Sequence, residues 1–304
     1  MERAKWSVPI SAPVIAVAGL LALAPYLVAA FFPARAAGCA RTLPPLVQIF
    51  CPALLCLPYL LIALTLGAFN WGWLALYALL PCAIAALLWQ ANQSDALSQS
   101  SWREFLILTV LGLAVDLRWF ERAWPAHLSV FNKILLLDAG IYAFIAVRNL
   151  QGVGFDLRLR LRDLAIGLRE FGFYLPAALA LGLSLGFLHL HRFDSAVGPL
   201  ILRFAGAWIF TFFFIAVPEE LFFRGWLQNL LERRMGRWPA LVTTAVLFGL
   251  SHFNKRAIHF NWRYVLLAAI AGIFYGRAWR RDRRIGASAV THATVDSVWS
   301  LWLR

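Results

Sequence analysis

The amino-acid sequence predicts an all-α fold, a polytopic transmembrane helical bundle with about eight or nine spans. The chain is 62% hydrophobic and only 14% charged, and its mean hydropathy is +0.71. Soluble domains are about 45–50% apolar and about 25% charged, so the composition excludes a soluble domain with a large core. Apolar runs of about 18 residues or more recur along the chain, each long enough to cross a bilayer. Because lipid offers the backbone no hydrogen-bond partners, we expect these spans to be helices.

The first three predicted spans follow one another closely, at residues 8–32, 45–69 and 71–89. Pro25 predicts a kink inside the first of them. This first span has no small-residue cleavage site after a short apolar core, which favours a membrane anchor over a removed signal peptide. The polar residues 90–104 then predict a loop.

The middle of the chain is less regular. Residues 105–115 form an apolar run too short to span. The charged, aromatic residues 116–124 either lie in the membrane interface or complete a tilted helix. Residues 134–147 form another short apolar run, which carries Asp138. Residues 155–170 mix leucine and arginine, and their first part alternates with period two, as a strand would. In this membrane context we expect a basic interfacial helix instead.

Gly152 and Gly154 precede that basic stretch and predict a boundary between two modules. Residues 1–150 would form an N-terminal transmembrane module, and residues 151–304 a C-terminal one. The predicted helical segments of the second module are residues 171–190, 203–231, 238–252, 264–279 and 285–303.

The net charge of +13 raises the question of nucleic-acid binding. The basic residues cluster between apolar runs, however, as in the arginine-rich stretch 277–284. Such flanking charges are typical of membrane topology and of contact with anionic headgroups, so we expect membrane lipids as partners and no nucleic acid. Arginine far outnumbers lysine and alanine is plentiful, which indicates a GC-rich bacterial genome and hence a multi-pass protein of the bacterial inner (plasma) membrane. A eukaryotic endomembrane location stays open.

Three ionisable residues interrupt the apolar run that contains VPEELFFRGW: Glu219, Glu220 and Arg224. Each would cost about 2.5–3.5 kcal/mol at the centre of a membrane helix, so they must pair or line a wet cavity. Glu220 and Arg224 are four residues apart and therefore neighbours on one helix face. Glu219 lies about 100° further round the helix, which leaves it as the working carboxylate.

Two later apolar segments carry polar groups at regular spacings. His252 follows Phe248 by four residues, and Asp296 follows His292 by four. Each group taken alone is more typical of helix pairing or of the membrane interface. Because they occur together in the C-terminal half, with the Glu219 segment, we interpret them as one site.

The three motifs in this order, EExxxR from Glu219, FxxxH ending at His252 and HxxxD from His292, resemble those of the CPBP family of CAAX proteases and bacteriocin-processing membrane proteins. The best-known members of this family are the type II CAAX prenyl endopeptidases. The resemblance covers roughly residues 160–304 and implies that residues 151–304 are an intramembrane protease domain.

Peptide hydrolysis needs an activated water, a proton donor for the leaving amine and a stabilised oxyanion. The resemblance implies that Glu219, as general base, and His252 activate the water. It also implies that Arg224 holds Glu220 in support of the site. His292, with Asp296, would bind the carbonyl oxygen as it gains charge.

Asp296 departs from the family pattern, because many members carry asparagine at this position. An ionised carboxylate only accepts hydrogen bonds, so it would repel an oxyanion. Asp296 must therefore be protonated or act through His292 by orienting the imidazole. The four-residue spacing favours the second interpretation.

A metal-dependent mechanism is the alternative to glutamate-based catalysis. Glu219, His252 and His292 also match the ligand types of hydrolytic zinc sites, and the family has often been described as metalloproteases. The sequence lacks HExxH, and its four cysteines form neither a CxxC motif nor a Cys/His cluster. We therefore expect no cofactor, with zinc as the alternative.

The expected substrate is a membrane-associated protein or peptide, cut near its C-terminus or close to the membrane. The resemblance allows a prenylated tail, a bacteriocin precursor or a C-terminal sorting tag. Two other functions stay open. One is a non-catalytic membrane partner or immunity-type protein that keeps the fold. The other is a proton-coupled transporter, although the inverted repeats typical of transporters are not evident in the sequence.

Overall fold

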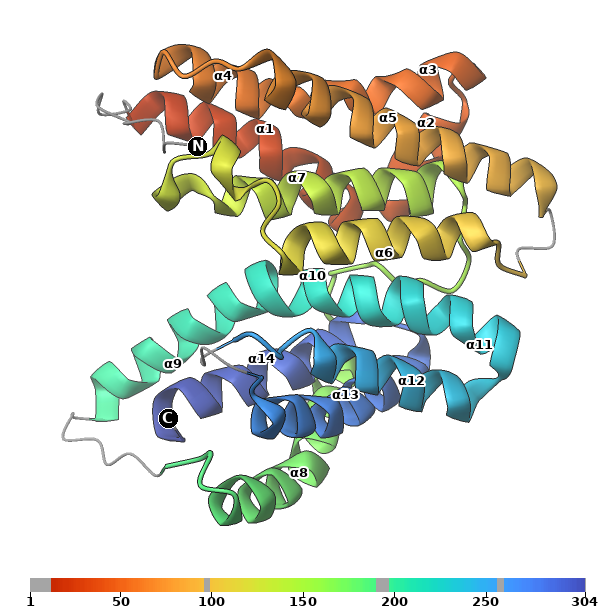
Figure 1. Cartoon of the computed structure of the whole chain (residues 1–304). Coiled ribbons are helices and arrows are strands. Elements are labelled where there is room, and N and C mark those ends of the chain that lie inside the picture. Colours follow the sequence, from red (N-terminus) through yellow and green to blue (C-terminus); the bar gives the residue numbers. More distant parts are fainter. Residues whose placement is uncertain (1–11, 96–98, 190–196, 256–259, 304) are drawn as a thin grey trace. The chain divides into compact units, whose positions relative to one another are not determined.

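A computed structural model describes residues 12–95, 99–189, 197–255 and 260–303 of the chain. These residues are mainly helical and contain no strand, so the predicted all-α bundle is confirmed over the part of the chain that is described. They divide into two compact units, Met1–Gln151 and Gly152–Arg304 (Figure 1). The start of the first predicted span, residues 8–11, lies outside the described residues.

Six helices of the described part are long and apolar enough to cross a membrane. They are Pro13–Phe31, Pro45–Thr65, Trp71–Ser94, Ala126–Val147, Leu161–Ser184 and Gly198–Met235. The predicted segments 238–252, 264–279 and 285–303 are also helical, but they are shorter or more polar than these six. The last of them is largely buried by its neighbours, so it can carry polar side chains without exposing them to lipid.

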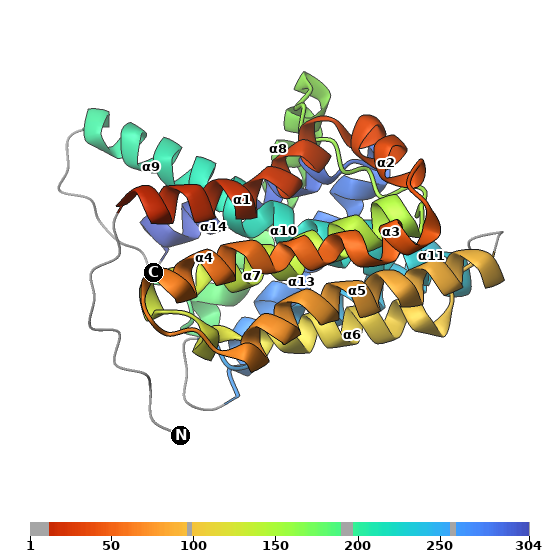
Figure 2. The same cartoon turned by 90° about the horizontal axis from the view of Figure 1, so that it is seen from above.

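In the first unit, α1 packs against α4 and α7 (Figure 2). Arg148 is fully buried and links the end of the first unit to its middle. Its guanidinium donates to Glu104 at 2.6 Å and to Asp95 at 2.7 Å. The predicted loop 90–104 is shorter than expected, since Ser101 and Glu104 form a capping box that starts the next helix. The elements are α1 (Ala12–Phe31), α2 (Pro33–Arg41), α3 (Pro45–Phe50), η1 (Cys51–Cys56), α4 (Leu57–Thr65), α5 (Trp71–Ser94), α6 (Trp102–Asp116), η2 (Glu121–Ala123), η3 (Ala126–Leu128), α7 (Val130–Ile141) and the π-helical η4 (Tyr142–Val147).

The second unit begins with an extended segment rather than a helix. The expectation of a helix over residues 155–170 is wrong for 155–160, because α8 (Leu161–Ser184) starts only at Leu161. Val153, Phe155 and Leu157 alternate inward, which fits the period-two pattern. The guanidinium of Arg284 then fixes the backbone by donating to the carbonyls of Asp156 and Arg158.

Gly154 lets this segment approach the rest of the unit closely. Its φ is +74°, and an added Cβ would lie 1.7 Å from the carbonyl oxygen of Arg283. Only glycine fits such a position without strain. The carbonyl of Gly154 accepts a hydrogen bond from the backbone N–H of Ile285 at 2.9 Å, which ties the segment to the start of α14 (Ile285–Trp302).

A single long helix, Gly198–Met235, carries the first motif. It consists of α9 (Val197–Thr211), η5 (Phe212–Ala216), α10 (Val217–Glu220), η6 (Leu221–Gln228) and α11 (Asn229–Met235). Both η5 and η6 are π-helical, so the two glutamates stand between two wider helical turns. Such π segments are frequent at functional sites, because they change the direction in which side chains project.

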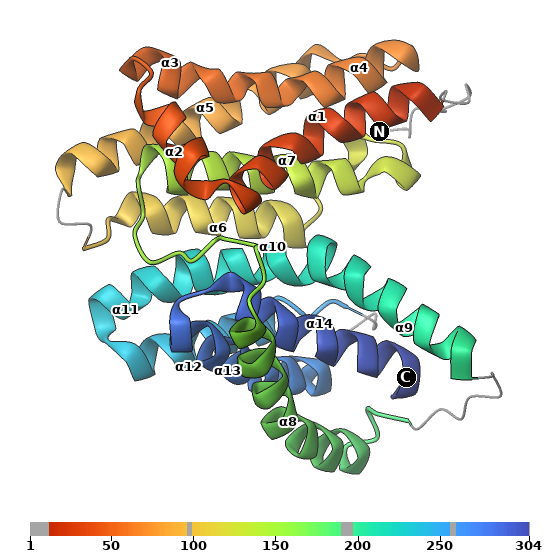
Figure 3. The same cartoon turned by 180° about the vertical axis from the view of Figure 1, so that it is seen from behind.

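The remaining helices enclose this segment. The long helix is followed by α12 (Arg237–Leu250), which packs against α13 (Trp262–Asp282), and α14 packs between α8, α9 and α13. Seen from behind, α8 crosses α13 and α14 (Figure 3). Glu219 and Glu220 of α10, His292 and Asp296 of α14, and His252 in the turn after α12 therefore come close to one another.

Candidate active site

A fully buried ion pair anchors the first motif. Nη1 of Arg224 donates to Oε1 of Glu220 at 3.0 Å, so the pairing expected from the four-residue spacing is present. Nη2 of Arg224 donates to the carbonyl of Gly272 in α13 at 3.0 Å. The guanidinium also lies 4.6 Å from the centre of the Phe248 ring, where cation–π attraction adds to the pairing. One arginine thus links the helices that carry the first two motifs to α13.

The third motif meets the first through Glu220. Nδ1 of His292 lies 2.8 Å from Oε1 of Glu220, and the hydroxyl of Ser288 contacts Oε2 of the same carboxylate. Ser288 also lies 3.0 Å from the carbonyl of Tyr275, but its single proton can serve only one acceptor at a time. An ionised Glu220 accepts, so Nδ1 of His292 carries the proton and Nε2 is directed to the opposite side.

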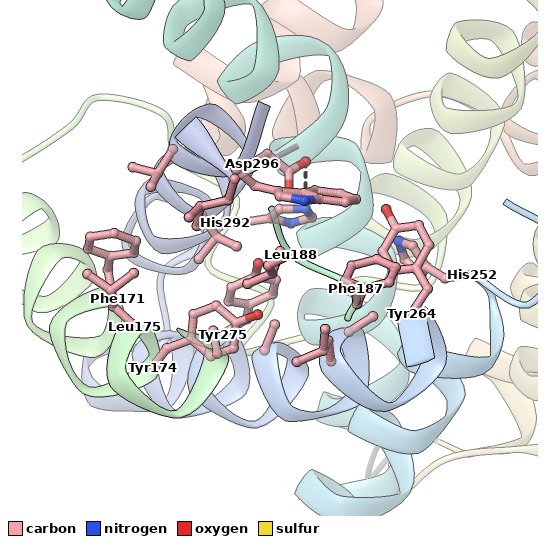
Figure 4. A pocket seen from close by; sticks show the side chains of 18 of the residues that line it. Phe171, Tyr174, Leu175, Phe187, Leu188, His252, Tyr264, Tyr275, His292 and Asp296 are labelled. Carbon is pink, nitrogen blue, oxygen red and sulfur yellow. Dashed lines mark ion pairs between the residues drawn. The ribbon is translucent and has the colours of Figure 1, made fainter. Parts of the chain in front are cut away.

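Two further carboxylates lie around Nε2 of His292. Oδ2 of Asp296 is 3.6 Å away and Oε2 of Glu219 is 3.9 Å away, which are ion-pair distances but too long for hydrogen bonds. These carboxylates are 31% and 28% exposed, whereas Glu220 is fully buried. The expected contact between His292 and Asp296 is therefore present (Figure 4), although the hydrogen bond that orients the imidazole comes from Glu220.

His252 follows the end of α12 and is held by its own helix. Its Nδ1 lies 2.8 Å from the carbonyl of Phe248, which can only accept, so Nδ1 is the donor and Nε2 is left for the site. The ring packs against Phe248 and Tyr264, each at 4.9 Å between ring centres. The FxxxH spacing thus fixes both the position and the tautomer of this histidine.

His252, His292 and Asp296 line one pocket (Figure 4). Its other walls are aliphatic and aromatic side chains of α8, α12, α13 and α14 and of the segment after α8, including Tyr174 and Leu188. The cavity volume is about 60 Å³, several times the 10–15 Å³ that one water molecule needs. Glu219 does not line this pocket, but charge interactions connect it with both histidines.

The structure thus joins Glu219, Glu220, Arg224, His292 and Asp296 in one network of contacts, with His252 on the wall of the adjoining pocket. Three further participants were not predicted from the sequence: Ser288, Tyr275 and Lys255. Ser288 precedes His292 by one helical turn, so its spacing could have revealed it. The Tyr275 ring stacks on His292 at 4.6 Å, and Lys255 lies 3.9 Å from Glu219, and neither contact has a sequence signal.

The alternative metal ligands were Glu219, His252 and His292. Within the described ranges, no group of three or more histidine, cysteine, aspartate or glutamate side chains is arranged to hold a metal ion. Both histidines use Nδ1 for bonds to other protein groups, which leaves Nε2 of each as the nitrogen that could bind a metal. Their tautomers are therefore compatible with either mechanism.

Residues 201–298 match a family model described as Rce1-like, type II CAAX prenyl endopeptidase. The matched stretch contains all six predicted site residues, and it confirms the resemblance to the CPBP family inferred from the three motifs. The match begins within α9 and is shorter than the expected range of about residues 160–304. None of the curated proteins and none of the solved structures matches the chain.

Proposed function

We propose that this multi-pass membrane protein, which carries an Rce1-like domain of the CPBP family at residues 201–298, is an intramembrane endopeptidase with a glutamate-based mechanism. The observation that carries the proposal is the arrangement around His292. Glu220 holds its Nδ1, while Glu219 and Asp296 lie 3.9 and 3.6 Å from its Nε2. The buried Oε2 of Glu219 has no hydrogen-bond partner among the described residues. Such an oxygen, beside an oriented imidazole and a pocket with room for water, suits the hydrolysis of a peptide bond.

Glu219 would act as the general base. Its Oε2 is buried and has no hydrogen-bond partner among the described residues. A water held there, with Nε2 of His252 as its second partner, would give a proton to Glu219 and attack the scissile carbonyl carbon. When the C–N bond breaks, Glu219 returns that proton to the leaving nitrogen. The products are a new amine and a new carboxylic acid, which then releases its proton to water.

His292 would stabilise the oxyanion through Nε2. In the imidazolium form Nδ1 donates to Glu220, and Nε2 donates to the oxygen of the tetrahedral intermediate. Asp296 lies beside Nε2 and favours this charged form without touching the oxyanion itself. Arg224 and Ser288 would keep Glu220 in place. The buried ion pair would thus hold His292 in position without taking part in the reaction.

The substrate of this proposed reaction is a membrane-associated protein or peptide cut near its C-terminus or close to the membrane. A prenylated tail, a bacteriocin precursor and a C-terminal sorting tag are all chemically suitable. The pocket is apolar apart from its histidines, Asp296 and three tyrosines, but about 60 Å³ is too small for a lipid chain. A lipidated or strongly apolar substrate would therefore have to open it. We place the protein in the bacterial inner membrane, in contact with membrane lipids.

The proposal is tested by comparing membrane proteomes of cells with wild-type protein and with Glu219→Gln. We expect specific C-terminal peptides to appear only with the wild type. Glu121→Gln is a matched control, because the two glutamates have similar surroundings. The side chain of Glu121 is 29% exposed and lies 3.9 Å from Arg118. The side chain of Glu219 is 28% exposed and lies 3.9 Å from Lys255. If Glu219→Gln changes no C-terminal peptide, the chain is better explained as a non-catalytic partner.

Metal analysis separates the two mechanisms. We expect purified active protein to retain its activity after chelation and dialysis. Stoichiometric zinc that is lost together with activity, and that restores activity when added back, would overturn the glutamate-based mechanism while leaving the protease assignment intact. A pH-gradient-driven flux in proteoliposomes that depends on Glu219, without any cleavage, would favour the transporter instead.

A further inference from the structure

Lys255 stands at the exposed edge of the candidate active site. Its Nζ lies 3.9 Å from Oε1 of Glu219, and the side chains of the two residues are 41% and 28% exposed. The other oxygen of this carboxylate, Oε2, is buried, has no hydrogen-bond partner among the described residues and lies 3.9 Å from Nε2 of His292. The two oxygens of Glu219 thus face two different basic groups, and Lys255 is the one outside the three motifs.

The backbone around Lys255 is held in place by Asn261. The side chain of Asn261 donates to the carbonyl of Lys255 at 3.3 Å, and its backbone N–H donates to the carbonyl of Phe253 at 3.0 Å. Asn261 also caps α13 by accepting from the N–H of Tyr264. The N–H of Lys255 donates to the carbonyl of His252 at 3.2 Å. Asn261 therefore fixes the backbone of Lys255, and Lys255 is in turn bonded to the backbone of His252.

The choice of lysine is unusual for this chain. The sequence has 28 lysine and arginine residues, and only Lys5, Lys133 and Lys255 are lysines. Arginine has a rigid planar fork, whereas lysine carries a compact point charge on a flexible stem. A point charge can approach one oxygen of a carboxylate and leave the second oxygen free.

The excess of carboxylates in the site also favours a cation at the position of Lys255. Three carboxylates, Glu219, Glu220 and Asp296, gather around His292. Among the described residues, Arg224 forms its ion pair with Glu220, and the basic groups within 4 Å of Glu219 are Lys255 and His292. Asp296 adds one negative charge compared with an asparagine at that position, and Lys255 adds one positive charge.

We propose that Lys255 is a positioning residue for Glu219. Its ammonium holds Oε1, so that Oε2 is directed at the water-binding position beside His292. This inference rests on the proposed protease function, because the aligned oxygen is the one that would accept the proton of water. A base displaced by about 1 Å can lose as much as 100-fold in rate, so a weak ion pair at the edge of the site can still matter for catalysis.

The kinetic test compares Lys255→Met, Lys255→Arg and the control Lys133→Met, which removes an exposed lysine from the first unit. We expect Lys255→Met to lower kcat about tenfold or more while KM changes less than about twofold, because the geometry of the base changes and the pocket does not. Lys255→Arg should restore kcat only in part, because its planar fork can engage both oxygens of Glu219. Lys133→Met should leave both constants unchanged. If Glu219→Gln abolishes cleavage but Lys255→Met keeps full kcat, the inference fails and the protease function stands.

A stability cycle tests the same contact without using activity. Lys255→Met should lower the Tm by about 1–3 °C in the wild-type background, as expected for a partly exposed ion pair. In the Glu219→Gln background the same substitution should shift the Tm by less than about 0.5 °C, since the partner charge is already gone. Equal shifts in both backgrounds would overturn the pairing. If the wild type proves inactive, the protease function fails, and this cycle still decides whether Lys255 holds Glu219.

Discussion

Arg224→Met tests the buried ion pair at the base of the site. The substitution removes the guanidinium that donates to Glu220 and Gly272 at 3.0 Å each. Glu220 is fully buried, so its charge would lose the arginine that pairs with it in the described part of the chain. Breaking one side of a buried pair costs about 3–5 kcal/mol, and we expect a loss of this size in the free energy of unfolding.

A second substitution shows whether the charge itself is responsible. Glu220→Gln in the Arg224→Met background removes the unpaired charge but keeps the size of the side chain. We expect the double variant to recover about 2 kcal/mol, so the two single losses should not add. The matched control is the exposed pair Arg118 and Glu121, 3.9 Å apart, whose coupling should be about 0–1 kcal/mol.

The assay is denaturant or thermal unfolding of purified protein in detergent, followed by tryptophan fluorescence, together with cleavage of substrate at a temperature where every variant is folded. Arg224→Met should also lower cleavage, because Glu220 orients His292. A stability loss below about 1 kcal/mol, or a coupling as small as that of the exposed control pair, would refute the reasoning.

Three further predictions concern single positions. Gly154→Ala should cost more than about 2 kcal/mol of stability, because the new Cβ would meet Arg283 at 1.7 Å, whereas Gly172→Ala, which meets no atom within 4 Å, should be neutral in the same melting assay. Asp296→Asn should keep cleavage within about tenfold of wild type, since the amide has the same shape and can donate to an oxyanion, and a complete loss would contradict this. The hydrogen bond from Arg158 lowers the pKa of Asp156 to about 2, so the ionised carboxylate stabilises the fold above about pH 4. Its contribution, about 1–2 kcal/mol, should vanish as the pH falls toward 2. The stability of Asp156→Asn should lack this dependence on pH.

Much of the site could be predicted because its pairs are local. Glu220 with Arg224, and His292 with Asp296, are four residues apart, and helix geometry alone brings such residues together. The long apolar runs likewise revealed the helices, because composition reports burial in lipid directly. The order of the three motifs then indicated the family.

The rest depends on packing between distant segments. The hydrogen bond between His292 and Glu220 joins residues 72 positions apart, and no local pattern reports it. The sequence likewise carried no signal for the π-helical turns on either side of the two glutamates. The arginines of residues 155–170 suggested an interfacial helix, so the extended conformation of residues 153–160 was not predicted. Val153, Phe155 and Leu157 nevertheless alternate inward, as in a strand. Its backbone is fixed by Arg284, more than a hundred residues away.

Cleavage by purified protein in liposomes tests the central claim most directly. Wild-type protein, Glu219→Gln and the control Glu121→Gln would be reconstituted with a membrane-associated substrate identified from the proteome comparison, and the new C-terminus would be read by mass spectrometry. We predict cleavage at one position by the wild type and by Glu121→Gln, and none by Glu219→Gln despite an unchanged fold. Equal cleavage by all three proteins would show that Glu219 is not the base.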